Sequence, residues 1–153
     1  MTSVSNAILL DTNVLVYCYD PRDRVEQDSA LDLVNRLEAA GRAVLSVQCL
    51  TEFFQVVTAR LPENLSREAA TARIEGLVRS FPVLDLTPTI VLEAGRGAAA
   101  QSISIWHALI WATAKINQVP GILTEDADHG RYWEGVRYFN PFAASFDEAA
   151  LGI

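Results

Sequence analysis

The sequence predicts an α/β protein, a three-layer α/β/α sandwich with a mostly parallel central sheet. Short, mainly apolar runs of the kind that form buried parallel strands alternate with longer segments whose apolar residues have helical spacing. The length agrees, because 153 residues match one domain of about 100–200 residues. We therefore expect a single domain over residues 1–153.

Four short, mainly apolar runs predict the strands. Runs of this kind, without strict alternation of polar and apolar residues, are typical of strands covered by helices on both faces. They comprise residues 7–10, 43–45, 121–124 and 136–139, and residues 82–86 form a brief extended piece. Asn140-Pro141 ends the last strand, because proline cannot donate to a strand ladder.

Six segments between these strands predict helices. Asp11 is an N-cap residue for the first helix, which stops at Asp20 because a residue before proline disfavours the helical conformation. Gly41 closes the second helix, and Ser46 can cap the third. The six helices are expected at residues 14–19, 26–40, 48–60, 66–81, 89–100 and 104–116.

Acidic residues stand where two of the predicted strands end. Asp11 follows the first strand and Asp126 follows the strand at 121–124, and ligands of such folds bind beyond the carboxyl ends of the strands. Glu52 lies one turn into a helix and has no cation three or four residues further along. Each acid also has a structural interpretation, as a helix cap, a turn residue or a surface glutamate. Together, converging carboxylates repel one another and indicate a cation that prefers oxygen ligands, Mg²⁺ or Mn²⁺.

Four segments together resemble the motifs of PIN-domain proteins. They are Leu10–Leu15, Ser46–Phe53, Ser104–Ala114 and Leu123–Gly130, in the family's order and spacing, and the resemblance covers roughly residues 7–142. Each segment alone is a weak signal, whereas four in order on the expected elements are specific. The length and the Glu-Asp-x-x-His-Gly pattern at 125–130 are most similar to VapC toxins of bacterial toxin–antitoxin pairs.

The resemblance implies a PIN-like fold and a toxin that hydrolyses RNA phosphodiester bonds as a metal-dependent endoribonuclease. It also implies a cognate antitoxin as partner and a homodimer. In the family, carboxylates hold one or two Mg²⁺ or Mn²⁺ ions, which activate water and stabilise charge on the scissile phosphate.

The resemblance assigns roles to particular residues of this chain. Asp11, Glu52 and Asp126 match the catalytic acids and metal ligands, and Asp128 matches a weaker fourth ligand that acts through water. Positions that steady the site by hydrogen bonds are matched by Thr12, Asn13 and Thr124.

Position 107 departs from the family pattern, which has an aspartate where this chain has His107. The neighbouring residues fit the motif, and no acid between Glu93 and Glu125 can take the role. A neutral imidazole is a metal ligand that favours Mn²⁺, Co²⁺, Ni²⁺ or Zn²⁺ over Mg²⁺, whereas a protonated one partly replaces the metal.

His107 leaves three possibilities open. The site works with a changed metal preference, or it is crippled, or the histidine was introduced to weaken a lethal nuclease. The alternative function is therefore a catalytically weakened or silent PIN module that binds RNA or antitoxin. A hydrolase with Asp11 as nucleophile is less favoured, because position 13 is Asn and the chain lacks Asp-x-Asp after the first strand.

Charge and composition narrow the other functional classes. With 19 acidic and 12 basic residues the net charge is −7, which argues against binding nucleic acid through a broad basic face. No apolar run approaches the roughly 20 residues of a membrane span, and the N-terminus lacks a signal-peptide pattern. We therefore expect a cytoplasmic protein without a membrane partner, in which Cys18 and Cys49 are reduced.

Some residues near the motifs have an ordinary and a functional interpretation. Trp106 and Trp111 are expected in the core or in a dimer interface rather than stacked on RNA. Arg22, Arg24 and Arg131 lie near the acids in sequence and can touch phosphates, although surface arginines without such a role are commoner.

Overall fold

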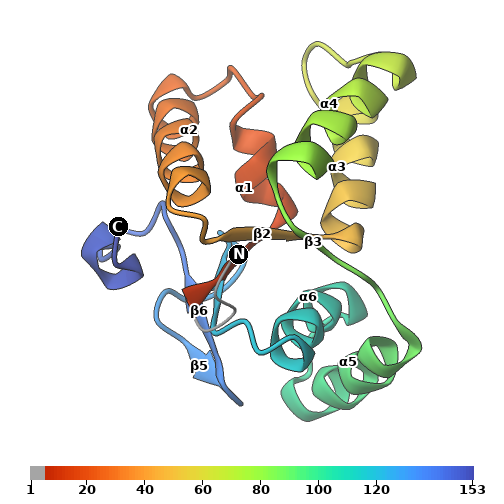
Figure 1. The fold of residues 1–153 in the computed structure, drawn as a ribbon, viewed down its shortest axis with the longest axis vertical. Helices are drawn as coiled ribbons and strands as arrows, with labels where there is room; N and C mark the ends of the chain where they lie inside the picture. Colours follow the sequence, from red (N-terminus) through yellow and green to blue (C-terminus); the bar gives the residue numbers. More distant parts are fainter. Residues whose placement is uncertain (1–5) are drawn as a thin grey trace.

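A six-stranded sheet lies between two layers of helices in the computed structural model, which describes residues 6–153 (Figure 1). The strands are β1 (Ile8–Leu10), β2 (Ala43–Ser46), β3 (Val83–Leu84), β4 (Gly121–Leu123), β5 (Tyr132–Trp133) and β6 (Val136–Phe139). Their order is β3-β2-β1-β4-β6-β5, and all neighbours are parallel except β5 and β6. The predicted α/β fold with a mostly parallel central sheet is confirmed.

Short-range capping sets where the helices begin. The α-helices are α1 (Thr12–Tyr17), α2 (Arg24–Ala39), α3 (Val47–Ala59), α4 (Arg67–Ser80), α5 (Pro88–Gln101) and α6 (Ile105–Ile116). The side chain of each N-cap residue accepts a hydrogen bond from a backbone N–H of the first turn. These N-cap residues are Asp11, Asp23, Ser46, Ser66, Thr87 and Ser104. Neither β5 nor the short 3₁₀ helix η2 (Glu148–Leu151) was predicted from the sequence.

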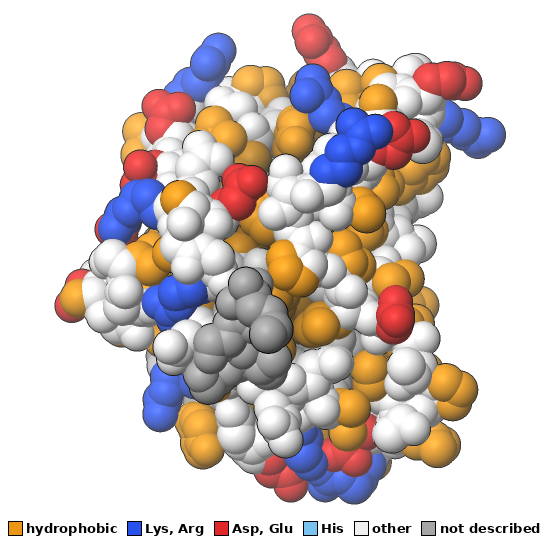
Figure 2. All heavy atoms as spheres, viewed as in Figure 1, with side chains coloured by type: hydrophobic (Ala, Val, Ile, Leu, Met, Phe, Trp, Pro, Cys, Tyr) orange, Lys and Arg blue, Asp and Glu red, His pale blue; other side chains and the backbone are white. Residues whose placement is uncertain are grey.

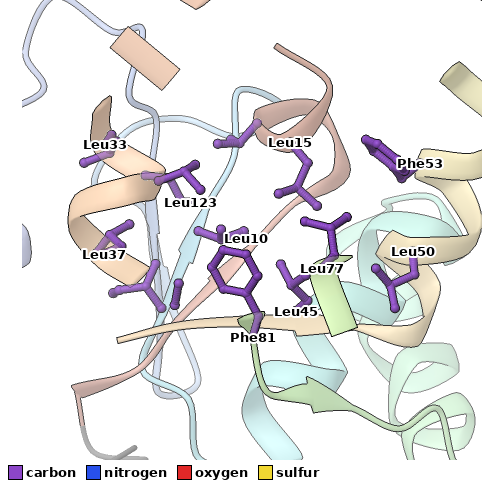
Figure 3. Packing of buried hydrophobic residues seen from close by; sticks show 14 of the residues in the cluster. Leu10, Leu15, Leu33, Leu37, Leu45, Leu50, Phe53, Leu77, Phe81 and Leu123 are labelled. Carbon is purple, nitrogen blue, oxygen red and sulfur yellow. The ribbon is translucent and has the colours of Figure 1, made fainter. Parts of the chain in front are cut away.

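The sheet separates two apolar cores. Helices α1–α4 cover one face and α5 and α6 cover the other (Figure 1). Because successive strand side chains point to opposite faces, Leu10 packs in the first core and Leu9 in the second. Figure 3 shows the first core, where Leu10 and Leu45 from the sheet meet Leu37 of α2.

The second core depends on one glycine. Trp111 of α6 is fully buried, and a Cβ on Gly97 of α5 would lie 2.5 Å from its ring. Glycine lowers helix propensity, but here it lets the two helices approach closely. Trp111 is thus a core residue as expected, whereas a core position is wrong for Trp106, which is 63% exposed.

The carboxyl ends of β1 and β4 meet at one edge of the sheet. Leu10 pairs with Leu123, and the backbone N–H of Asp11 donates to the Leu123 carbonyl (2.9 Å). The chain continues from β1 to β2 on one side, whereas β4 lies on the other, so the strand order reverses here. Such a switch point is where α/β sheets bind ligands.

The surface shows no broad basic face in the view of Figure 2. Charged side chains of both signs lie mainly along the rim, and polar and apolar groups fill the middle. Across residues 6–153, no helix combines the length and the apolar character needed to cross a bilayer.

Candidate active site

A hydrogen-bond network joins Asp11 to Asp126 across the ends of β1 and β4. The Thr124 hydroxyl donates to Asp11 Oδ2 (2.8 Å) and accepts from the backbone N–H of Asp126 (3.0 Å). Asn13 Nδ2 lies 3.4 Å from Asp11 Oδ2 and 3.0 Å from Asp126 Oδ2. The two carboxylates therefore face the same amide group, and the loop after β4 is held against the first turn of α1.

Asp11 carries a buried negative charge. It is only 8% exposed, and its Oδ1 accepts from the backbone N–H of Thr12 (2.7 Å). The pKa of Asp11 is raised to about 6, mainly by burial and to a smaller extent by the charges of Asp126 and Glu52, while the hydrogen bonds from Thr124 and Thr12 act in the opposite direction. A cation next to these oxygens would relieve both the desolvation and the repulsion.

Glu52 lies beside this pair of aspartates and is held by neutral donors. Thr12 Oγ1 donates to Glu52 Oε2 (3.0 Å), and Gln48 Nε2 donates to Glu52 Oε1 (2.7 Å). Gln48 Nε2 also donates to the Trp106 carbonyl (2.9 Å), which ties α3 to the first turn of α6. The position of Glu52 is thus fixed, while its charge has no basic partner among the side chains that bond to it.

His107 faces Asp126 from the first turn of α6. Its Nε2 is 3.6 Å from Asp126 Oδ2, and the two side chains are 53% and 49% exposed. The His107 backbone N–H donates to Ser104 Oγ (3.2 Å), which holds the residue in the first turn of α6. Asp128 is exposed, and within residues 6–153 its carboxylate makes no hydrogen bond to Asp11, Asp126 or Glu52.

A small cavity of about 50 Å³ brings two of the acids and His107 together, whereas Glu52 and Asp128 do not line it. Asp11, Asp126 and His107 line it, with Gln101 and Arg131 on its wall. A larger hollow of about 880 Å³ lies between α3, α4 and Trp106, with mainly apolar lining and Glu52 at its side. The ionisable groups converge on the small cavity, so we take that one as the candidate site.

Two neutral residues at the site, Gln48 and Gln101, were not predicted as site residues from the sequence. Gln48 stands four residues before Glu52, so both lie on one face of α3, and that spacing is a readable signal. Gln101 has no such signal, because it reaches the cavity from the end of α5.

The chemistry of the donor set fits a divalent cation. Two carboxylates and one imidazole line the same cavity, and hard cations such as Mg²⁺ and Mn²⁺ take carboxylate oxygen. As the side chains stand, no three His, Cys, Asp or Glu residues in the described part of the chain are grouped as ligands of one ion. The fit therefore rests on the identity of Asp11, Asp126 and His107 and on the unbalanced charge of the two carboxylates.

Comparisons with known proteins give a family and a fold. A search of curated proteins returned no match. The structure of FitAB bound to an IR36 DNA fragment is similar, with a TM-score of 0.67 and 22% identity over 90% of this chain and 97% of that chain. A toxin–antitoxin complex from Klebsiella pneumoniae has a TM-score of 0.64 and 18% identity over 89% and 98% of the two chains. VapC20 from Mycobacterium tuberculosis, described as a sarcin-ricin loop cleaving toxin, has a TM-score of 0.59 and 17% identity over 76% and 87%.

At these identities the structural likeness shows a shared fold. The family model described as the PIN domain matches residues 8–134, which is most of the chain. This range contains all four motifs and every acid of the candidate site. The chain therefore belongs to the PIN domain family.

Proposed function

We propose that this chain is a metal-dependent endoribonuclease of the VapC toxin type that hydrolyses RNA phosphodiester bonds. The observation that carries the proposal is the single cavity lined by Asp11, Asp126 and His107 at the carboxyl ends of β1 and β4. Membership of the PIN domain family supports it. The fold shared with VapC20, described as a sarcin-ricin loop cleaving toxin, supports RNA as substrate.

Asp11, Asp126 and His107 would hold Mg²⁺ or Mn²⁺, with Glu52 beside them and Asp128 as a weaker fourth ligand that acts through water. When bound, such an ion supplies a Lewis acid that lowers the pKa of water and stabilises charge on a phosphate. Thr124 and Asn13 orient Asp11 Oδ2 and Asp126 Oδ2 toward the cavity by direct hydrogen bonds.

Glu52 and His107 complete the proposed site from α3 and α6. Thr12 and Gln48 hold the two oxygens of Glu52 in place. The half-exposed His107 offers an imidazole nitrogen where the family pattern has a carboxylate, which lowers the negative charge facing RNA. Nitrogen ligation shifts the preferred ion from Mg²⁺ toward Mn²⁺.

The same proposal includes the partners. The similar complex from Klebsiella pneumoniae is a toxin–antitoxin complex, which supports a cognate antitoxin as the protein that neutralises this chain. A homodimer in the cytoplasm completes the proposal, in line with free Cys18 and Cys49.

Two observations favour a second candidate, a silent PIN module that binds RNA or antitoxin without cleavage. His107 replaces the third acid of the motif, and no three ligands are grouped in the described residues. The two candidates differ in whether RNA is cut.

The test measures cleavage of a structured RNA by the chain and by His107→Asp, each with Mg²⁺, Mn²⁺ or EDTA. Asp11→Asn is the matched control, because it keeps the shape and the helix cap but removes the charge. Cleavage by the chain that EDTA and Asp11→Asn abolish supports the nuclease, and we expect a preference for Mn²⁺ that His107→Asp moves toward Mg²⁺. Cleavage only by His107→Asp supports the silent module. If neither protein cuts any of several RNAs, the nuclease proposal is wrong.

A further inference from the structure

Arg131 is a cation on the wall of the cavity that Asp11 and Asp126 also line. Within the part of the chain that the structure describes, it is the one arginine or lysine among the residues that line this cavity. The first acid, Asp11, and the exposed pair of Asp126 and His107 line the same space. The cavity therefore has both negative and positive groups on its walls.

The Arg131 guanidinium is held in place without an ion pair. Its Nη2 donates to Gln101 Oε1 (2.6 Å), and its backbone N–H donates to the Asp128 carbonyl (3.1 Å). No carboxylate in residues 6–153 forms an ion pair with it, whereas Arg22 is paired with Asp20 (2.6 Å). Arg131 thus keeps an unneutralised charge at the site, and Arg22 does not.

Gln101 adds a second donor that has no partner. Its Nε2 is buried and donates no hydrogen bond to any described residue, while its Oε1 accepts from Arg131. That bond fixes the orientation of the amide, because an oxygen must face the guanidinium donor. A buried donor without an acceptor is costly, and an acceptor supplied by a ligand would satisfy it.

These donors suit a phosphate oxygen. An RNA phosphodiester is an anion with two non-bridging oxygens, and arginine is well matched to phosphate because its planar donors form charge-assisted hydrogen bonds. We propose that Arg131 and Gln101 form a phosphate-binding wall that takes a non-bridging oxygen of the RNA backbone beside Asp126 and His107. This inference rests on the proposed function, since it assigns the substrate contact of the same site. Such a contact reads the backbone and not the sequence.

The test measures binding of two fluorescein-labelled RNA hairpins of unrelated sequence, by fluorescence anisotropy over a range of salt concentrations. All variants carry Asp11→Asn and are measured in EDTA, so that the RNA is not cut. Arg131→Gln is compared with Arg67→Gln, which removes the same charge from an exposed position on α4 outside the cavity. Gln101→Glu gives Arg131 a carboxylate partner and turns the free donor into an acceptor.

We expect Arg131→Gln to weaken the binding of both hairpins by the same factor, about tenfold. The slope of the logarithm of the binding constant against the logarithm of the salt concentration should fall by about 1. Gln101→Glu weakens binding similarly, Arg131→Lys keeps the salt slope, and Arg67→Gln changes little. Thermal unfolding by circular dichroism verifies that each variant is folded. If Arg131→Gln and Arg67→Gln behave alike while the background protein binds RNA, the phosphate wall is wrong and the proposed function stands. If the Asp11→Asn protein binds neither hairpin and the unmodified chain cuts no RNA, both the phosphate wall and the proposed function are wrong.

Discussion

Two groups of charged residues on this molecule differ in how their charge is balanced. The first joins α5, α6 and the turn after β5: Lys115 Nζ lies 2.7 Å from Glu93 and 3.1 Å from Glu134, and Arg96 pairs with both acids. It holds two acids and two bases. The second is the candidate site, where hydrogen bonds to the acids come from neutral donors, namely Thr12, Asn13, Gln48 and Thr124.

The pKa values of the two groups move in opposite directions. The hydrogen bonds from Arg96 and Lys115 lower the pKa of Glu93 to about 2, whereas burial and neighbouring acids raise the pKa of Asp11 to about 6. The first group is satisfied within the chain and stabilises the packing of α5 on α6. The second remains unsatisfied, and unbalanced charge in a cavity is typical of a site that takes a ligand.

Asp11→Asn should have the largest effect and should separate function from stability. RNA cleavage should fall at least about a hundredfold, since loss of an outer partner of a metal site alone costs about 10–100-fold. The folded protein should be at least as stable, because an amide keeps the helix cap without a buried charge. Cleavage rates and urea unfolding at neutral pH measure the two effects. A large loss of stability would contradict the assignment of Asp11 as an unbalanced charge.

The pH dependence of stability should have opposite signs for the two groups. The folded Asp11 carboxyl keeps its proton up to a pKa of about 6, against 3.8 as the ordinary value. The stability of the chain relative to Asp11→Asn therefore falls as the pH rises through this window, by on the order of 3 kcal/mol at most. Glu93 stabilises the fold above its ordinary pKa of 4.5, and this contribution is lost as the pH falls toward about 2.

Urea unfolding of the chain, Asp11→Asn and Glu93→Gln in metal-free buffer checks both signs. The difference between the chain and Asp11→Asn is expected to shrink toward acid pH. The difference between the chain and Glu93→Gln is expected to shrink there too, but from the opposite sign, since Glu93 stabilises the fold and the Asp11 charge does not. If both differences in the free energy of unfolding, each taken with its sign, changed with pH in the same direction, the charges of the two groups would be balanced in the same way.

Gln48→Leu should weaken the site without weakening the fold. Leucine removes the donor that holds Glu52 and the Trp106 carbonyl, but it also removes the buried Gln48 Oε1 that lacks a partner in the described residues, so that the two effects on stability oppose each other. We expect kcat to fall about tenfold, in the range for groups that orient metal ligands, with KM and the melting temperature little changed. Gln55→Leu, an exposed position on the same helix, is the control and should keep full activity. Equal activity of both variants would contradict a positioning role for Gln48.

Glu93→Gln should have the smallest effect, on stability alone. Partly exposed ion pairs contribute up to about 1 kcal/mol, which corresponds to about 2–4 °C in melting temperature for a chain of this size. Glu75→Gln breaks a more exposed pair on α4 (3.7 Å) and should change almost nothing. RNA cleavage by both variants should equal that of the unmodified chain. A loss of cleavage in Glu93→Gln would mean that the balanced group is coupled to the site.

Most of the fold was readable because it depends on neighbours in sequence. Asp11 and Ser104 start helices through hydrogen bonds to residues one to three positions away. The apolar runs of β1 and β4 marked buried strands. The two-residue strand β5 was missed, since its pairing with β6 depends on a turn in which Glu134 and Gly135 take positive φ values.

For the candidate site, the residue types were predictable and the arrangement was not. Asp11 and Asp126 follow parallel strands, so their convergence follows from topology. That Asn13 would stand between them, and that Glu52 would bond to Thr12 and Gln48, depends on how α1 and α3 pack. The exposure of Trp106 and the burial of Trp111, five residues apart on one helix, likewise depend on which face α5 covers.

The sequence by itself determined the order of the six α-helices and of every strand except β5, the edge of the sheet that carries the acids, and the histidine in place of an aspartate. Local hydrogen bonds and apolar periodicity are enough to predict the order of the elements and the edge that carries the acids. The histidine is read directly from the residue at position 107. Only the tertiary structure decided that Asp11 is buried with a raised pKa, and that Gln101 and Arg131 meet on the wall of its cavity. Burial and contacts between distant segments arise when the chain closes on itself, and no local pattern encodes them.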